Sequence, residues 1–345
     1  MSTLQQAIAR IQPLDEAAMA AARARQDTLT KPAGALGRLE AISIQLAGIT
    51  RQPVPQLGIK TVLVMAADHG VAEDGVSAYP AEVTAQMVAN FKAGGAAINV
   101  LARHVGATVR VLDMGVGQPT GNISRGPAME RARATQCIER GIAAAEEEVA
   151  RGASLLATGD MGIGNTTPSS AIVAAFSRLP ARQVTGRGTG VSDEQFERKV
   201  ALVSRALEVN HPDPADALGV LAAVGGFEIA GIAGAILGAA AAGTPVVIDG
   251  FISGAGALIA AGLAPACVPY MFAAHRSVEV GHAVALNLLG LEPLLALDLR
   301  LGEGTGAALA MSLIEAAAKI LAEMATFAEA GVSESDEQAQ TPQLA

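Results

Sequence analysis

The residues Thr61-Val-Leu-Val-Met-Ala66 form an unbroken apolar run that is rich in β-branched side chains. Such a run is typical of a strand that is buried on both faces of a sheet. Similar runs recur along the chain, separated by Ala-rich helical stretches, at Thr108–Met114, Ser154–Thr158, Pro245–Asp249, Cys267–Ala273 and Leu294–Leu299. Strands that alternate with helices predict a mainly parallel sheet with helices on both faces, so the expected fold class is doubly wound α/β.

Both ends of the chain have helical patterns instead. Four helices are expected there, at Thr3–Ile11, Glu16–Leu29 (with Asp15 as its N-cap), Leu36–Thr50 and Gly304–Phe327. These helices predict a small helical domain from residues 1–50 and about 305–332, and a large α/β domain at 58–304. Residues 333–345 lack apolar periodicity, so we predict that they form a disordered tail.

Bulk composition limits the classes of function. The net charge is −9 and the aromatic content is 3 %, so we expect neither a basic groove that follows a phosphate backbone nor an aromatic surface on which bases stack. Nucleic acid is therefore not an expected partner. The two cysteines, Cys137 and Cys267, are too few for a disulfide framework and lack metal-ligand spacing. Residues 1–10 show no signal-peptide pattern, so a reducing cytoplasm is the expected compartment.

The segment Ile229–Ile248 carries no charge and contains Gly234-Ala-Ile-Leu-Gly238, a spacing of small residues that is also found in packed membrane helices. Most of the segment is Ala and Gly, which transfer weakly into lipid, and it has no aromatic belt or basic flank. We therefore expect a helix packed closely on the sheet and no membrane span.

Two Gly-rich loops predict an anion site. Asp160-Met-Gly-Ile-Gly-Asn-Thr-Thr167 precedes an expected helix, and glycines next to a helix N-terminus let backbone N–H groups approach a phosphate. Gly186-Arg-Gly-Thr-Gly190 leads into a second helix that carries Lys199, a cation suited to a phosphate clamp. The alternatives are a tight turn with Asn165 or Thr166 as an N-cap, and a solvated surface lysine.

Glu303 lies in a third such loop, Arg300-Leu-Gly-Glu-Gly-Thr-Gly306, after the expected strand Leu294–Leu299. A carboxylate at a strand end is a candidate general base, provided that apolar neighbours such as Leu299 and Leu301 raise its pKa by desolvation. The alternative is a carboxylate that caps the helix starting near Thr305, which would lower the pKa.

Polar and soft apolar groups follow Ser77-Ala-Tyr-Pro80, where an expected helix presents Gln86 and Met87. One amide beside polarizable apolar atoms suits a planar heteroaromatic ligand, although a methionine in ordinary core packing has the same pattern. His69, which follows Asp68 at a strand end, is expected to be structural, because no second histidine occurs at ligand spacing nearby.

Taken together and in this order, the loops resemble the nicotinate-nucleotide:dimethylbenzimidazole phosphoribosyltransferases of cobalamin biosynthesis. The resemblance covers about residues 30–332. The matching segments are Lys31–Glu40, Ala67–Val71, Val76–Pro80, Gly94–Asn99, Met161–Thr167, Gly186–Gly190, Val247–Ile252 and Arg300–Ala308.

The resemblance implies transfer of phosphoribose from nicotinate mononucleotide to 5,6-dimethylbenzimidazole, which gives α-ribazole phosphate and nicotinate without a cofactor or a metal. It also implies a Rossmann-like sheet, a small helical domain built from both chain ends, and a homodimer. Glu303 matches the family's general base, which takes the benzimidazole proton while the other ring nitrogen attacks C1′ with inversion. The other site residues that it implies are Gly162, Gly164, Asn165, Gly188, Gly190, Lys199, Asp249 and Gly250 for phosphate and ribose, Ser277 for nicotinate, and Ser77, Tyr79, Gln86 and Met87 for the benzimidazole.

One departure concerns Asp160, which stands where the family commonly has Glu, so a ribose contact or a second base role at that position stays open. Two other functions are compatible with these loops. A sugar-phosphate isomerase would also need phosphate loops and a Glu base, but it would bury no dimethylated aromatic ring. A module that senses nicotinate mononucleotide without turnover would need no base.

Overall fold

The computed structural model describes residues 2–333, which form two compact units. Among the described residues, the large unit contains 2–13 and Gly58–Met311, and the small unit contains Leu14–Leu57 and 312–333. The boundaries differ from the predicted ones, because the first helix and the first turns of the last long helix belong to the large unit. Residues 334–345, most of the predicted tail, lie outside the described residues.

A five-stranded sheet forms the centre of the large unit, and every strand pair in it is parallel. Its strands are β1 (Ile59–Ala67), β2 (Ala107–Gly115), β3 (Ala153–Met161), β4 (Val246–Ile248) and β5 (Met271–Ala273). Their spatial order is β2-β1-β3-β4-β5, which confirms the doubly wound α/β class. The connection from β1 leads to β2 on one side of β1, and the connection from β2 leads to β3 on the other side. The topological switch point therefore lies between β1 and β3, and a ligand crevice is expected at the carboxyl ends of these strands.

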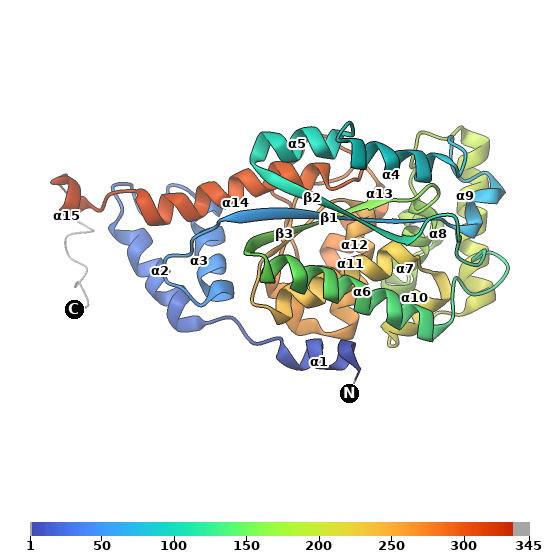
Figure 1. The fold of residues 1–345 in the computed structure, drawn as a ribbon, viewed down its shortest axis with the longest axis horizontal. Coiled ribbons are helices and arrows are strands. Elements are labelled where there is room, and N and C mark those ends of the chain that lie inside the picture. The colour runs from blue at the N-terminus through green and yellow to red at the C-terminus, as the bar shows by residue number, and fades with distance from the viewer. Residues whose placement is uncertain (1, 334–345) are drawn as a thin grey trace. The chain divides into compact units, whose positions relative to one another are not determined.

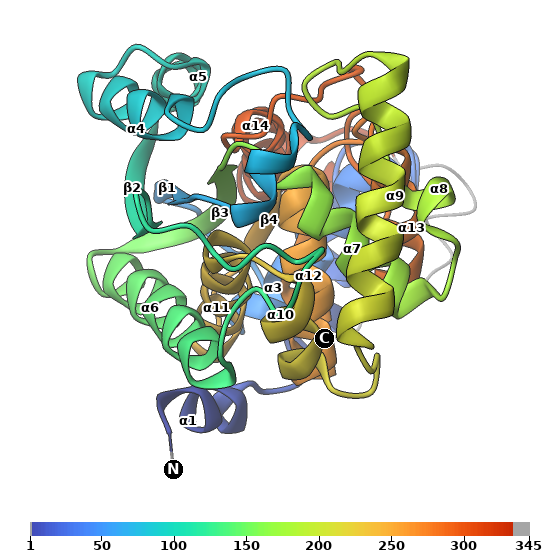
Figure 2. The same cartoon turned by 90° about the vertical axis from the view of Figure 1, so that its right-hand side faces the viewer.

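Helices cover both faces of this sheet (Figures 1 and 2). α4 and α5 lie on one face, and α6 and α11 lie on the other. The helices of the large unit are α1 (Thr3–Arg10), η1 (Gly70–Asp74), α4 (Val83–Ala93), α5 (Ala97–Val105), α6 (Arg131–Ala150), α7 (Thr166–Ser177), α8 (Ala181–Val184), α9 (Asp193–Asn210), α10 (Ala217–Val224), α11 (Phe227–Ala241), α12 (Phe251–Leu263), η2 (Pro265–Tyr270) and α13 (Val280–Leu289). α14 (Thr305–Glu323) begins in the large unit and ends in the small one.

Two of the predicted strands differ in the structure. The run Cys267–Ala273 is extended only over β5, because Pro265–Tyr270 forms η2. Leu294–Leu299 is not a strand; its one ladder contact is an isolated bridge between Leu295 and His275. Asp298 has a left-handed backbone with φ of 53°, which ends the extended conformation there.

The small unit contains α2 (Glu16–Thr28), α3 (Arg38–Thr50) and α15 (Phe327–Ala330). Asp15 caps α2 as predicted, since its side chain accepts the backbone N–H of Ala18 at 2.9 Å. One buried cluster of this unit consists of Ala18, Ala22, Ala47 and Leu321, and larger aliphatic side chains of the unit are buried as well, namely Leu29, Ile42, Leu46 and Ile49.

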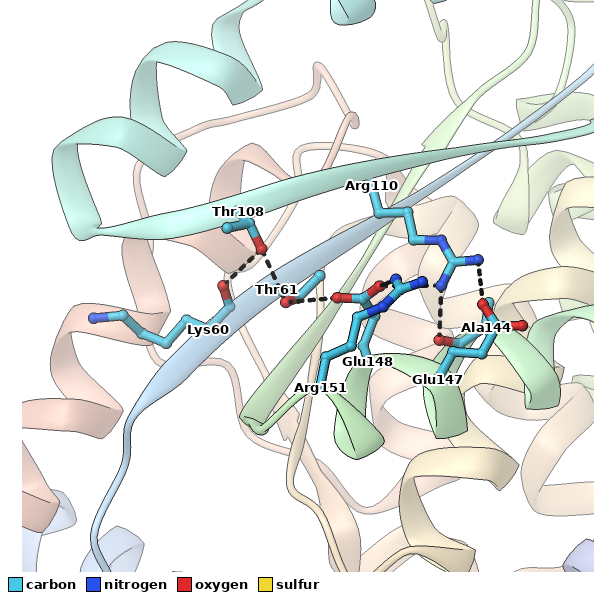
Figure 3. A network of polar contacts seen from close by, with 8 residues as sticks. All are labelled: Lys60, Thr61, Thr108, Arg110, Ala144, Glu147, Glu148 and Arg151. Atoms are coloured by element: carbon cyan, nitrogen blue, oxygen red, sulfur yellow. Dashed lines mark hydrogen bonds and ion pairs between the residues drawn. The ribbon is translucent and has the colours of Figure 1, made fainter.

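A polar network holds the edge strand β2 to its neighbours (Figure 3). The guanidinium of Arg110 on β2 contacts Glu147 at 2.7 Å and Glu148 at 3.0 Å, both on α6. The hydroxyl of Thr61 on β1 lies between β2 and α6, 3.0 Å from the Thr108 hydroxyl and 3.4 Å from the Glu148 carboxylate. Because Glu148 is 8 % exposed, this network satisfies a nearly buried carboxylate as well as fixing the strand.

α6 and α11 cross at a distance that only glycine permits. A Cβ on Gly234 would lie 2.0 Å from the carbonyl oxygen of Ile138, and one on Gly141 would lie 2.0 Å from the carbonyl oxygen of Gly231. Every residue of α11 from Phe227 to Ala240 is buried. The uncharged segment Ile229–Ile248 is therefore a packed core helix followed by β4, as its composition predicted.

By length and composition, the described residues contain one helix that could cross a membrane, α14, and 56 % of its apolar window is buried inside the protein. The core helix of a folded domain meets the same criterion, so this feature is weak support for a span.

We expect Gly234→Ala to lower the free energy of unfolding by about 1–3 kcal/mol, because the helices must separate to accept the methyl group. Alanine alone favours a helix by about 1 kcal/mol over glycine, so a loss would report the packing clash. Urea unfolding monitored by circular dichroism measures it. In the control, Gly126→Ala, no heavy atom lies within 4 Å of the new Cβ. Equal stability of the two variants would contradict the close crossing.

Candidate active site

A cavity of about 410 Å³ lies in the large unit and is lined by the segments that follow β3, β4 and β5 and by the loop before α14. Nine predicted site residues line it: Tyr79, Met87, Asp160, Gly162, Asn165, Gly188, Gly250, Ser277 and Glu303. Six others do not: Ser77, Gln86, Gly164, Gly190, Lys199 and Asp249. The sheet thus brings segments that are distant in sequence to one crevice at its carboxyl edge.

Glu303 is 5 % exposed and has a left-handed backbone with φ of 62°. Its carboxylate oxygen Oε2 accepts the backbone N–H of Ile98 at 3.1 Å. Burial raises the pKa of Glu303, and this single N–H bond opposes the rise. Leu301, which was expected to desolvate the carboxylate, lines the same cavity but is 58 % exposed.

Asp249, and not Glu303, stabilises the start of α14. Its carboxylate accepts the N–H of Gly304 at 3.2 Å and that of Ala307 at 2.8 Å. Asp249 is fully buried, which raises its pKa to about 7 against the lowering effect of the backbone N–H groups of Ala307, Gly304 and Gly306. The structure therefore places Asp249 behind the loop that carries Glu303, where it holds that loop rather than lining the cavity.

Asp160 lies beside the same loop. Its backbone carbonyl accepts the N–H of Glu303 at 3.2 Å, and its Oδ2 accepts the side-chain amide of Asn165 at 3.0 Å. Its other oxygen, Oδ1, is buried without a hydrogen-bond partner among the described residues. Burial, and then the nearby charge of Asp249, raises the pKa of Asp160 well above its ordinary value, which favours the neutral carboxylic acid.

The loop Gly186–Gly190 is held by charged side chains on both sides of Gly188. The N–H of Gly188 donates to Glu279 at 2.8 Å, and its carbonyl accepts from Arg300 at 3.1 Å. Its φ is 55°, and a Cβ there would lie 3.0 Å from both the Lys199 ammonium and the Thr166 hydroxyl. Gly188 is thus the point where the loop meets α7, α9 and the segment before α14.

Lys199 on α9 is fully buried, so it is not the solvated lysine of the alternative interpretation. Its ammonium donates to the Thr166 hydroxyl at 2.7 Å. Burial lowers the pKa of Lys199 to about 8, and the charge of Glu279 opposes that effect. The ammonium therefore lies directly behind Gly188, where its positive charge is only partly balanced by negative charge, so an added anion would stabilise it.

An apolar wall closes another side of the cavity. Val83 and Met87 are four residues apart on α4, so both face the cavity, whereas Gln86 is exposed on a different face of the helix. Tyr79 also lines the cavity and is 57 % exposed. Ser77 lies just outside, with its hydroxyl 3.3 Å from that of Thr189.

The lining residues to which the sequence analysis gave no part in substrate binding or catalysis include Thr166, His275, Glu279 and Arg300. Thr166 and Arg300 stood inside recognised motifs, and position in those motifs was the only signal. Glu279 and His275 follow β5, and their part in the cavity depends on contacts with residues about 90 positions earlier or 20 later. His69 is buried and pairs with Glu228 at 2.8 Å, in keeping with a structural role.

Comparison with known proteins gives consistent results. A family model described as "Phosphoribosyltransferase" matches residues 11–332. A protein of Roseiflexus sp. (strain RS-1) named nicotinate-nucleotide--dimethylbenzimidazole phosphoribosyltransferase is 62 % identical, covering 96 % of this chain and 99 % of the relative. A protein of the same name from Chloroflexus aggregans is 61 % identical, covering 98 % and 100 %. The crystal structure of CobT from Thermus thermophilus is 50 % identical, with a TM-score of 0.89, and the match covers 92 % of this chain and 100 % of that one.

Proposed function

The chain belongs to this phosphoribosyltransferase family, and we propose that it transfers phosphoribose from nicotinate mononucleotide to 5,6-dimethylbenzimidazole. The products are α-ribazole 5′-phosphate and nicotinate, the first of which supplies the lower ligand of cobalamin. The observation that carries the proposal is that one cavity combines a buried carboxylate, Glu303, with an apolar wall and a Gly-rich loop backed by Lys199. These are the three things that a base, a flat aromatic acceptor and a phosphorylated donor require.

Glu303 acts as the general base in this proposal. Its carboxylate takes the N–H proton of the benzimidazole, and the other ring nitrogen attacks C1′ of the ribose. The bond from C1′ to nicotinate breaks at the same centre, and its electron pair returns to the pyridinium ring, so nicotinate leaves with a neutral ring nitrogen and needs no acid. Attack opposite the leaving group inverts C1′. The raised pKa of Glu303 supports this role, because it improves the carboxylate as a proton acceptor.

Other residues bind and position the substrates. Phosphate and ribose are assigned to Gly162, Gly164, Asn165, Gly188, Gly190, Lys199, Asp249 and Gly250, nicotinate to Ser277, and the benzimidazole to Ser77, Tyr79, Gln86 and Met87. Within this set, Asp249 contributes through the Glu303 loop, because its carboxylate is already bonded to that loop. Asp160 is assigned as a neighbour of Glu303 that keeps Asn165 in place.

Assembly and compartment are further parts of the proposal. A homodimer that acts in the cytoplasm on small molecules is expected from the family resemblance. Light scattering coupled to size-exclusion chromatography measures the assembly directly.

Turnover of nicotinate mononucleotide by the purified protein tests the proposed function. We expect nicotinate release only when 5,6-dimethylbenzimidazole is present, and we expect it to continue in buffer containing EDTA, since the phosphate is not the reacting group. Donor binding without release would favour the sensing module. Conversion of a sugar phosphate with no response to the benzimidazole would favour the isomerase.

A further inference from the structure

The charge of the cavity is unbalanced for an anionic donor. Its lining includes the carboxyl groups of Glu279 and Glu303, besides that of Asp160, whose raised pKa favours the neutral acid. Among residues 2–333, Arg300 is the only arginine or lysine in that lining, because Lys199 lies behind it. A donor with a phosphate and a ring carboxylate carries more negative than positive charge, so an exposed cation is needed inside the cavity.

Backbone pairing places Arg300 beside the segment that follows β5. The N–H of Arg276 donates to Leu295, and the N–H of Val278 donates to Leu299 at 3.3 Å. Arg300, the next residue, therefore neighbours Ser277 and Glu279, both of which line the cavity. One guanidinium nitrogen, Nη1, reaches the carbonyl of Gly188 at 3.1 Å. The side chain spans from the loop of the proposed base to the loop of the proposed phosphate site.

Within residues 2–333 this is the one hydrogen bond of the Arg300 side chain, so most of the guanidinium fork is available for a ligand. A guanidinium has five N–H donors in a planar arrangement that matches carboxylate and phosphate oxygens. The Gly188 N–H, which would otherwise be an obvious phosphate donor, is already bonded to Glu279. The Gly188 N–H is therefore already occupied, whereas the Arg300 guanidinium has N–H groups left to bind an anion.

We propose that Arg300 is a specificity-determining residue that binds an anionic group of the donor, either the 5′-phosphate or the ring carboxylate. The proposal rests on the proposed function for the identity of the donor. The Gly188 contact fixes the guanidinium plane, and the donor anion takes N–H groups that this contact leaves over. Because the anion is present in both ground state and transition state, Arg300 contributes mainly to donor affinity and little to kcat.

Three donors distinguish the two anions. Nicotinate mononucleotide has both groups, nicotinamide mononucleotide lacks the carboxylate, and nicotinate riboside lacks the phosphate. Steady-state kcat and KM are measured for the wild type, Arg300→Gln and Arg300→Lys, with 5,6-dimethylbenzimidazole saturating. Arg276→Gln is the matched control, since Arg276 is exposed, lies in the paired segment and does not line the cavity.

For Arg300→Gln we expect KM for nicotinate mononucleotide to rise about 10- to 100-fold, with kcat within about threefold, from loss of a hydrogen bond to a charged group. Arg300→Lys retains part of the affinity, because an ammonium keeps the charge but not the fork. If Arg300→Gln raises KM for nicotinate mononucleotide but not for nicotinamide mononucleotide, Arg300 binds the ring carboxylate. If it raises KM for nicotinate mononucleotide but not for nicotinate riboside, Arg300 binds the 5′-phosphate. Equal losses with all three donors, or none, would overturn the proposal.

Equilibrium binding of nicotinate mononucleotide to the same variants, measured by calorimetry, separates this inference from the proposed function. A wild type that binds the donor without turnover contradicts the proposed transferase, yet the Arg300→Gln affinity still decides the role of Arg300. Normal turnover by the wild type together with an unchanged affinity in Arg300→Gln contradicts the inference alone.

Discussion

Glu303→Gln is expected to lower kcat by about 100-fold or more, while donor binding stays close to that of the wild type. Glutamine keeps the size of the side chain and one carbonyl oxygen for the N–H of Ile98. It does not accept the benzimidazole proton, so the attacking nitrogen stays poorly nucleophilic. Rates of nicotinate release under saturating substrates, together with donor affinity, measure the two effects separately.

The pH dependence gives a second readout of the same residue. The pKa of Glu303 is raised, so its carboxylate is expected to become protonated, and kcat to fall, at a higher pH than for an ordinary glutamate. That acid limb should be absent in Glu303→Gln. As a control, Glu197→Gln alters a surface carboxylate that is paired with Arg182, and should leave kcat unchanged. Near-normal turnover of Glu303→Gln would exclude Glu303 as the essential base.

Lys199→Ala has the second largest expected effect, a rise of about 10- to 100-fold in KM for the nucleotide donor with a smaller change in kcat. The buried ammonium lies behind Gly188, so its removal deletes the charge that we propose attracts the donor phosphate, and it removes the N–H donor of the Thr166 hydroxyl. Equilibrium donor binding measures this loss. Lys92→Ala, at an exposed position on α4, is the control. An unchanged donor affinity in Lys199→Ala would remove Lys199 from the phosphate site.

The same lysine predicts how donor affinity depends on pH. Its pKa in the empty protein is about 8, below its ordinary value, because burial disfavours the cation. Below pH 8 the ammonium is present and attracts phosphate, and above pH 8 the donor must bind together with a proton. Donor affinity is therefore expected to weaken as pH rises through this pKa, and Lys199→Ala should lose that dependence.

Much of the fold was readable from local pattern. The runs that became β1 and β3 have β-branched or other apolar side chains in continuous stretches, so pattern and tertiary structure agree there. The run that became β2 contains Arg110 and Asp113, and this strand lies at the edge of the sheet and is mostly only partly buried. Leu294–Leu299 had the apolar content of a strand but not its backbone, since Asp298 turns left-handed and the segment lies against residues after β5. Apolar content alone does not separate a strand from an extended loop that packs on a sheet edge.

The site was predictable only in part, because sequence motifs report residue types and not bond partners. Glu303 was found as a loop carboxylate flanked by glycines, and the structure buries it in the cavity. The cap of α14 was not predictable, since Asp249 lies 55 positions before the first N–H that it accepts. Nor was the partner of Gly188, because Glu279 is 91 positions away and carried no motif role.

The backbone around Glu303 narrows the side chains that the position tolerates. Gly302, Glu303 and Gly304 all have positive φ, at 84°, 62° and 91°. In a saturation library at position 303, Val, Ile and Thr would carry a conformational penalty on top of the missing base, whereas Asn and Asp adopt this backbone more readily. Inactive variants would therefore divide into misfolded and folded classes, and only the second reports chemistry. At position 303 the left-handed backbone and the proposed role as a base both restrict the choice of side chain. A search for variants with a different general base is therefore better directed at other residues that line the cavity.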